Sequence, residues 1–202
     1  MSTHLRLAAM LLLIGGHAGG AEPPAPRATE VRTAIFAGGC FWCIEADFEK
    51  LPGVLAAESG YTGGRTANPS YEQVSAGNTG HTEAIRVSYD PQRVSYPQLL
   101  DYFWRHIDPT VRNRQFCDVG TQYRSGIYWQ NETERKAAES SRDALLASGK
   151  LPHIETEIVA AATFYPAEEY HQDYYKKNPI RYAYYRQGCG RDARVKQIWG
   201  SS

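Results

Sequence analysis

The segment Thr33-Ala-Ile-Phe-Ala-Gly-Gly-Cys-Phe-Trp-Cys-Ile-Glu45 predicts the first β-α unit of the fold. Its apolar start, Thr33 to Phe36, is typical of a buried strand, and a helix is expected from Cys40 to about Glu49. A cysteine at a helix start lies beside free N–H groups, which favour the thiolate. The glycine pair ahead of Cys40 allows a sharp turn that leaves the sulfur accessible. The segment therefore predicts a reactive thiol next to an aromatic pair.

The elements expected after this unit complete a β-α-β-β-α-β order. The best strand is Thr82 to Tyr89, which alternates cleanly, and Ser95-Tyr-Pro-Gln98 resembles a capping box that opens a helix to about His106. The order is that of a ferredoxin-like (split βαβ) core, so we predict a two-layer α+β fold with additional elements and long loops. The other predicted elements are strands at 54–59, 126–129 and 154–160, helices at 131–148 and 168–177, loops at 60–80 and 108–124, and an aromatic, basic tail from 181.

The N-terminal residues resemble a signal peptide. Arg6 precedes an apolar run, Leu7 to Ile14, and small residues follow up to Ala21. The run is too short for a permanent membrane helix. We therefore expect a signal peptide at 1–21, a flexible lead-in at 22–31, a single catalytic domain at 32–202, and export, to the periplasm in a bacterium.

Composition limits the classes of partner. The chain has 202 residues, 42% of them hydrophobic, which indicates a globular protein with a substantial core. Lys+Arg and Asp+Glu both total 22, so no strong field favours nucleic acid or a charged membrane. We expect a monomer.

The four cysteines are Cys40, Cys43, Cys117 and Cys189. An oxidising compartment favours disulfides, and four cysteines allow three pairings. Cys40 and Cys43 form a C-x-x-C that is compatible with a thioredoxin-like redox pair. A zinc site is disfavoured, because no second C-x-x-C is present.

Several polar residues are further site candidates. Glu83 shares a strand face with Ile85 and Val87, and burial there would raise its pKa and make it a proton donor. Asp118 and Tyr123 lie in the second long loop, and Tyr71 lies in the first. The histidines at 81, 106, 153 and 171 show no metal spacing and are expected on the surface or in loops, with His81 a weak candidate.

Taken together, several motifs closely resemble the A-type peptide methionine-S-sulfoxide reductase family, from about Thr33 to Gly190. They are Gly39-Cys-Phe-Trp-Cys-Ile-Glu45, Gly60-Tyr-Thr-Gly-Gly64, Tyr71-Glu-Gln-Val74, Gly80-His-Thr-Glu-Ala84, Tyr89-Asp-Pro91 and Asp118-Val-Gly-Thr-Gln-Tyr-Arg-Ser125.

The resemblance implies a role for each matching residue. Cys40 would be the nucleophile and Glu83 the acid that protonates the sulfoxide oxygen. The remaining roles are Phe41 and Trp42 as walls for the S-methyl group, Tyr71 and Tyr123 as hydroxyls that bind the oxygen, and Asp118 as the residue that orients the substrate.

The implied reaction needs no bound cofactor or metal. Cys40 would attack the sulfur of free or protein-bound methionine sulfoxide and become a sulfenic acid, which a second thiol converts to a disulfide. An external dithiol, thioredoxin or a thioredoxin-like partner, would reduce that disulfide.

The identity of the second thiol stays open. Many family members have glycine in place of Cys43 and a small polar residue in place of Cys117. Cys189 matches the family's recycling cysteine and lies in a Gly-Cys-Gly turn of a tail that we expect to be flexible. Cys189 is favoured, with Cys117 and Cys43 as alternatives and a relay through two of them as a further option.

Two rival functions remain at this stage. A periplasmic thiol–disulfide oxidoreductase would use Cys40 and Cys43 and would not need Glu83. A disulfide-bonded binding module would have all four cysteines paired.

Overall fold

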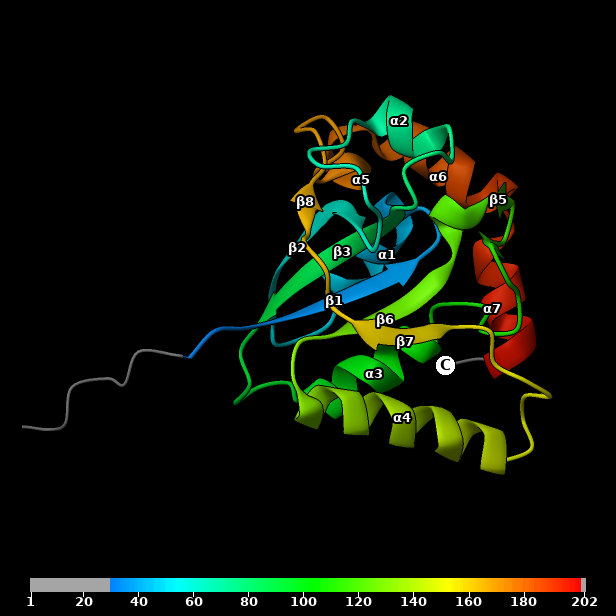
Figure 1. Ribbon diagram of the computed structural model, residues 1–202. Coiled ribbons are helices and arrows are strands. Elements are labelled where there is room, and N and C mark those ends of the chain that lie inside the picture. Colours follow the sequence, from blue (N-terminus) through cyan, green and yellow to red (C-terminus); the bar gives the residue numbers. More distant parts are fainter. Residues whose placement is uncertain (1–29, 201–202) are drawn as a thin grey trace, which may run out of the picture.

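The structure is a computed structural model that describes residues 30–200. The predicted signal peptide at 1–21 and residues 22–29 of the predicted lead-in lie outside this range. Within it the chain forms an α+β fold, with helices packed around a central mixed sheet (Figure 1). None of the helices between residues 30 and 200 has the length and apolar character to span a membrane.

The four central strands confirm the predicted ferredoxin-like core. They stand in the order β6-β1-β3-β2, and each neighbouring pair is antiparallel. One helix links β1 to β2 and another lies between β3 and β6, as a split βαβ requires. The bounds are β1 Arg32–Gly38, α1 Phe41–Phe48, β2 Val54–Thr62, β3 Thr82–Tyr89, α3 Tyr96–Trp104 and β6 Ser125–Trp129.

Additional strands extend this core. At one edge β7 (Glu157–Ala160) pairs in parallel with β6, and at the other β8 (Tyr165–Pro166) pairs with β2. Both predicted long loops contain short elements that the sequence pattern did not show. These are α2 (Tyr71–Ser75), the two-stranded β4 (Arg114–Gln115) and β5 (Asp118–Val119), and the 3₁₀ turn η1 (Thr121–Tyr123).

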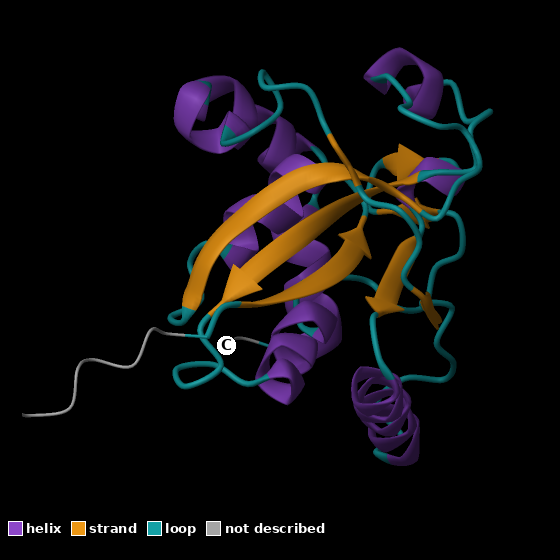
Figure 2. Ribbon diagram, turned by 60° about the vertical axis from the view of Figure 1, so that its left-hand side comes forward, coloured by secondary structure: helices purple, strands orange, loops and turns teal. Residues whose placement is uncertain are grey.

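The main core lies between the sheet and helices α1 and α3, which Figure 2 shows behind the twisted strands. Phe36 of β1 is fully buried, and its ring centroid lies 5.2 Å from that of Phe48 on α1 and 5.0 Å from that of Phe103 on α3. Each buried aromatic side chain contributes about 1.5–3 kcal/mol of transfer free energy. This packing fixes α1, and with it Cys40, against the strand that precedes it.

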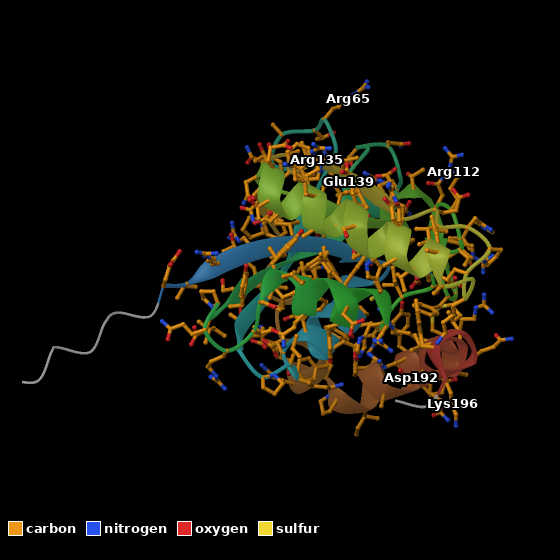
Figure 3. All side chains as sticks on the ribbon, turned by 90° about the horizontal axis from the view of Figure 1, so that it is seen from below. Arg65, Arg112, Arg135, Glu139, Asp192 and Lys196 are labelled. Atoms are coloured by element: carbon orange, nitrogen blue, oxygen red, sulfur yellow. A yellow bond between two sulfur atoms is a disulfide. The ribbon has the colours of Figure 1, made fainter. Side chains whose placement is uncertain are left out.

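Two predicted helix starts are confirmed by their caps. The Ser95 hydroxyl accepts the N–H of Gln98, whose side chain accepts the N–H of Ser95 in return, so α3 begins with a full capping box. Asn131 accepts the N–H of Glu134 at the start of α4 (Glu132–Ala147). The outer face of α4 is charged, and Arg135 Nη1 lies 2.9 Å from Glu139 Oε1. Figure 3 labels both residues on this helix.

The C-terminal region differs from the prediction. A helix at 168–177 ended by Pro179, followed by a flexible tail, was expected, but the chain forms α5 (Tyr174–Lys177), α6 (Pro179–Gly188) and α7 (Arg191–Trp199). Pro179 starts α6 instead of ending a helix, because the first turn leaves its N–H groups without helical partners. Gly190, with φ +69°, separates α6 from α7.

Buried charges attach these helices to the end of α1 and to the end of β1, on either side of the segment that carries Cys40. Arg186 of α6 lies 2.9 Å from Asp47 Oδ1, and Arg191 of α7 donates to the carbonyl of Gly38 at 3.1 Å. These contacts hold the tail in place as a cover beside Cys40.

Candidate active site

Cys40 is the N-cap residue of α1, directly after a turn that needs glycine. Gly39 has φ +81°, and a Cβ there would lie 2.5 Å from Gln115 Cβ. The predicted sharp turn is thus confirmed. The expected accessibility is not, because only 6% of Cys40 is exposed beneath the aromatic residues of α5 and α6.

The charge state of Cys40 also differs from the prediction. Burial raises the pKa of the Cys40 thiol well above its ordinary value, and the neighbouring Cys43 and Glu83 raise it further. The first N–H of α1, from Phe41, is donated to Glu83 and not to the sulfur. The effect of the short helix α1, which favours the thiolate, is therefore smaller than the effect of burial, which favours the thiol. The Cys40 sulfur holds its proton in this closed state.

Cys43 lies one turn further along α1 and shows the opposite effect. Its pKa is lowered, first by a hydrogen bond with Cys40 and then by the positive charges of Arg191 and Arg186, although burial opposes the shift. The two buried thiols therefore act as a coupled pair in which Cys43 ionises first.

Glu83 lies on β3 with its carboxyl directed at the start of α1. It is 2% exposed, and its Oε2 accepts the N–H of Phe41 at 2.9 Å. Burial raises the pKa of Glu83 to about 8, which the Phe41 hydrogen bond only partly offsets. The predicted burial and raised pKa are confirmed, and the side chain holds a proton near neutral pH.

Tyr71 and Tyr123 come from the two long loops and meet near Glu83. Burial, followed by the charge of Glu83, raises the pKa of Tyr71 to about 12 and that of Tyr123 further above its usual range. Both hydroxyls therefore stay protonated and can donate hydrogen bonds. Tyr71 is held by its backbone N–H, which donates to Glu168 Oε1 at 2.8 Å.

Asp118 is half-buried at the start of β5, close enough to Glu83 for its charge to raise the pKa of that carboxyl. Its Oδ2 accepts the hydroxyl of Tyr185 at 2.6 Å, and burial raises the pKa of its carboxyl. The Tyr185 hydroxyl also interacts with the Cys40 thiol. Tyr185 thus connects the nucleophile candidate to Asp118.

The aromatic pair after Cys40 is built into a larger cluster. Phe41 is buried, whereas Trp42 is half-buried and stacks on Tyr174 with ring centroids 3.7 Å apart and an angle of 6°. The Trp42 Nε1–H donates to His171 Nδ1 at 3.0 Å. Phe41 and Trp42 therefore lie together with Tyr71 beside Cys40, as an apolar wall requires.

Sequence reasoning missed three residues of this site, namely His171, Tyr174 and Tyr185. His171 and His81 both lie outside the helices and strands, as expected of loop histidines, but both are buried and neither is at the surface. His81 instead holds the turn at Gly64, whose N–H it accepts at 3.1 Å. The sequence signal was the density of aromatic residues from Tyr170 to Tyr185, but without a fold it did not place any ring.

The cysteines separate into two pairs. Cys117 and Cys189 form a disulfide, whereas Cys40 and Cys43 are free. A binding module with four paired cysteines is therefore contradicted. A site with four sulfur ligands is also not formed, because two of the sulfurs are bonded to each other.

The arrangement offers a defined chemistry. A buried sulfur lies beside a carboxyl that still holds a proton near neutral pH, and two phenols lie close enough to that carboxyl for its charge to raise their pKa values. Such a cluster can protonate an oxygen while the sulfur attacks the atom that carries it. Redox exchange between Cys40 and Cys43 alone would need neither the carboxyl nor the phenols.

Comparison with known proteins agrees with this site. The family model described as peptide methionine sulfoxide reductase matches residues 32–202. Peptide methionine sulfoxide reductase MsrA 2 of Caulobacter vibrioides is 50% identical over 181 residues, which are 90% of this chain and 92% of that protein. Peptide methionine sulfoxide reductase MsrA of Bacillus licheniformis is 52% identical over 169 residues, which are 83% of this chain and 93% of that protein.

Solved structures show the same relationship. Mxr1 of Saccharomyces cerevisiae in its reduced form matches with a TM-score of 0.69 and 34% identity, over 76% of this chain and 88% of that one. Methionine sulfoxide reductase A of Corynebacterium diphtheriae matches with a TM-score of 0.67 and 37% identity, over 76% and 77%. The chain described here belongs to the peptide methionine sulfoxide reductase family.

Proposed function

We propose that this protein reduces methionine S-sulfoxide, free or in oxidised proteins, with Cys40 as the nucleophile and Glu83 as the proton donor. The observation that carries the proposal is the buried hydrogen bond between the start of α1, where Cys40 lies, and Glu83 of β3. Glu83 is fixed to the N–H that follows Cys40, and it holds a proton near neutral pH. A sulfoxide oxygen leaves only when it is protonated, so a neutral acid beside a thiol matches this substrate.

The chemical step transfers one oxygen atom. The Cys40 sulfur loses its proton, attacks the sulfoxide sulfur and takes up the oxygen as a sulfenic acid, while the substrate sulfur gains two electrons and leaves as a thioether. Glu83 protonates the oxygen, and the hydroxyls of Tyr71 and Tyr123 donate to it. Preorganised donors of this kind stabilise the charge that develops on the oxygen in the transition state.

The aromatic cluster supports selection of the substrate. Phe41 and the half-buried Trp42 provide an apolar wall for the S-methyl group, and the stacked Tyr174 and the hydrogen-bonded His171 hold the indole in place. Asp118, which accepts the Tyr185 hydroxyl beside Cys40, would bind the polar backbone of the substrate. Since Cys40 is 6% exposed, the cover formed by Tyr185 must shift to admit substrate.

Turnover requires a second thiol and an external dithiol. The sulfenic acid condenses with another cysteine of the chain, water leaves, and a thioredoxin or thioredoxin-like protein reduces the disulfide. No bound cofactor takes part in these steps.

The test is reduction of methionine S-sulfoxide with dithiothreitol as electron donor. We expect methionine to form with the wild-type protein and not with Cys40→Ser. A rival thiol–disulfide oxidoreductase would instead reduce protein disulfides at a rate that Glu83→Gln does not change. That outcome would contradict the proposal.

We also propose that the protein is exported and works outside the cytoplasm. Arg6, the apolar run that follows it and the small residues up to Ala21 support a cleaved signal peptide. Cell fractionation followed by N-terminal sequencing tests this. An N-terminus shortly after Ala21 in the exported fraction is expected, and an uncleaved chain in the cytoplasm would contradict it.

A further inference from the structure

The disulfide between Cys117 and Cys189 lies at the surface, beside the closed site. Cys117 is exposed and Cys189 half-buried, whereas the free thiols of Cys40 and Cys43 are 6% and 2% exposed. Figure 1 shows β5, which begins right after Cys117, next to α6, which ends right before Cys189. A protein reductant can therefore reach this disulfide without moving α6, but it cannot reach Cys40 or Cys43.

The disulfide is also connected to the active site. Asp118 Oδ2 lies 2.6 Å from the Tyr185 hydroxyl, which interacts with Cys40, and 4.0 Å from Cys189 Sγ. Tyr185 and Cys189 are one turn apart on α6, joined by a backbone hydrogen bond of 2.9 Å. A small shift of the last turn of α6 would bring Cys189 towards Cys40.

The surroundings of the two sulfurs are not equivalent. The Cys117 N–H points at Cys189 Sγ, with an N–S distance of 3.2 Å, and would stabilise a negative charge on that sulfur. Cys117 is the more exposed residue of the pair. Attack by an external thiolate is therefore favoured at Cys117, with Cys189 as the leaving group.

We propose that Cys117 and Cys189 form the terminal disulfide of the catalytic cycle, and that Cys117 is the sulfur attacked by the external dithiol. The inference rests on the proposed function. It adds Cys117 as a catalytic residue at the point where the electrons enter, and it interprets this structure as the stage that awaits the reductant, with Cys40 and Cys43 already reduced.

The steps balance as thiol–disulfide exchanges. The Cys189 thiol condenses with the Cys40 sulfenic acid, and water leaves. The Cys117 thiolate then attacks Cys189 Sγ, and Cys40 leaves and takes up a proton. Finally one thiol of the external dithiol attacks Cys117, its second thiol releases Cys117, and the donor leaves as a disulfide.

The test counts the methionine that forms in the absence of reductant. A fully reduced wild-type protein should form about two equivalents, because the first oxidation passes to Cys117 and Cys189 and Cys40 then reacts again. The same protein with the disulfide left intact should form about one, since only the buried pair is then reduced. Equal yields from the two preparations would overturn the proposal, whereas no methionine from either would contradict the proposed function itself.

Two variants sharpen the test. Fully reduced Cys117→Ser should form about one equivalent, because Cys40 stays bonded to Cys189, and its thioredoxin-driven turnover should fall by about tenfold or more. A thioredoxin that lacks its second active-site cysteine should be trapped on Cys117, as peptide mass spectrometry can show. A burst of two equivalents from Cys117→Ser, or a trapped adduct on Cys40, Cys43 or Cys189, would overturn the assignment.

Discussion

The Phe41 N–H donates a 2.9 Å hydrogen bond to Glu83 Oε2, and this contact connects the turn after Cys40 with strand β3. The amide that could have stabilised a Cys40 thiolate instead holds the acid in position. The site at rest therefore pairs a protonated thiol with a buried carboxyl whose pKa is raised to about 8. A sulfoxide substrate needs such an acid, and a simple disulfide exchange does not.

The pKa of Glu83 predicts how activity depends on pH. The raised pKa keeps the carboxyl protonated below about pH 8, so single-turnover methionine formation should fall as pH rises through that value. Glu83→Gln keeps an oxygen acceptor for the Phe41 N–H but has no proton to give. Glu83→Gln should lower the rate of methionine formation by on the order of a hundredfold, and the rate should no longer fall as pH rises through about 8. A variant with the wild-type rate would exclude the proton-donor role.

The raised pKa of Glu45 should make the free energy of unfolding, and not the catalytic reaction, depend on pH. Its carboxyl accepts the Ser59 hydroxyl at 2.6 Å and the Asp173 N–H at 2.7 Å, and burial raises its pKa from 4.5 to about 7. As pH rises from 4.5 towards 7 the unfolded chain loses this proton before the folded one, so the free energy of unfolding should fall by on the order of 3 kcal/mol.

Urea unfolding at pH 5 and pH 8 measures this effect. Glu45→Gln, which cannot ionise, should show a smaller decrease in the free energy of unfolding between the two pH values than the wild type. Parallel decreases in the two proteins would show that Glu45 does not have the raised pKa.

The position of Gly39 should not tolerate a side chain. Its φ of +81° costs an alanine about 1–3 kcal/mol, and the new Cβ would also lie 2.5 Å from Gln115 Cβ. Gly39→Ala should therefore lower the free energy of unfolding and move Cys40. Gly149→Ala is the matched control, because Gly149 has φ +69° and no atom within 4 Å of a new Cβ. If both variants lost equal stability, the contact with Gln115 would have no effect.

Removing the His171 side chain should raise KM and leave kcat nearly unchanged. Its Nδ1 accepts the Trp42 Nε1–H at 3.0 Å, and loss of one such bond corresponds to about 1 kcal/mol, or roughly a fivefold rise in KM. His171→Leu should show this rise with little change in kcat, because Trp42 contacts the methyl group, and not the reacting oxygen, in the proposed function. His171→Asn keeps an acceptor near the same place and should recover most of the affinity. A fall in kcat alone would instead indicate a role in the chemical step.

The central fold and the core of the site could be predicted because they depend on residues that are close together in the sequence. The strand from Thr82 to Tyr89, the capping box at Ser95 and the Asn131 cap depend on nearby residues, and these predictions are confirmed. The burial of Glu83 followed from its place on the face of Ile85 and Val87.

What the sequence did not reveal depends on contacts between distant segments. Tyr185 enters the site on α6, which Arg186 attaches to Asp47 near the end of α1, while Arg191 attaches α7 to Gly38 at the end of β1. The pKa of Cys40 was wrongly predicted for the same reason, since the cover formed by these helices removes water from the sulfur. The pairing of Cys117 with Cys189 likewise joins residues 72 positions apart, and the spacing of the cysteines does not determine it.

The most direct test of the account locates the oxygen after one turnover. A variant with Cys43→Ser, Cys117→Ser and Cys189→Ser keeps Cys40 as its only cysteine, so no second thiol of the chain can condense with it. This variant is mixed with methionine S-sulfoxide in the absence of reductant, methionine is measured, and a sulfenic-acid reagent followed by peptide mass spectrometry maps the oxidised cysteine. We predict one methionine per protein and the label on Cys40. Methionine without a label on Cys40, or a label with no methionine formed, would contradict the claim that Cys40 is the atom that takes the oxygen.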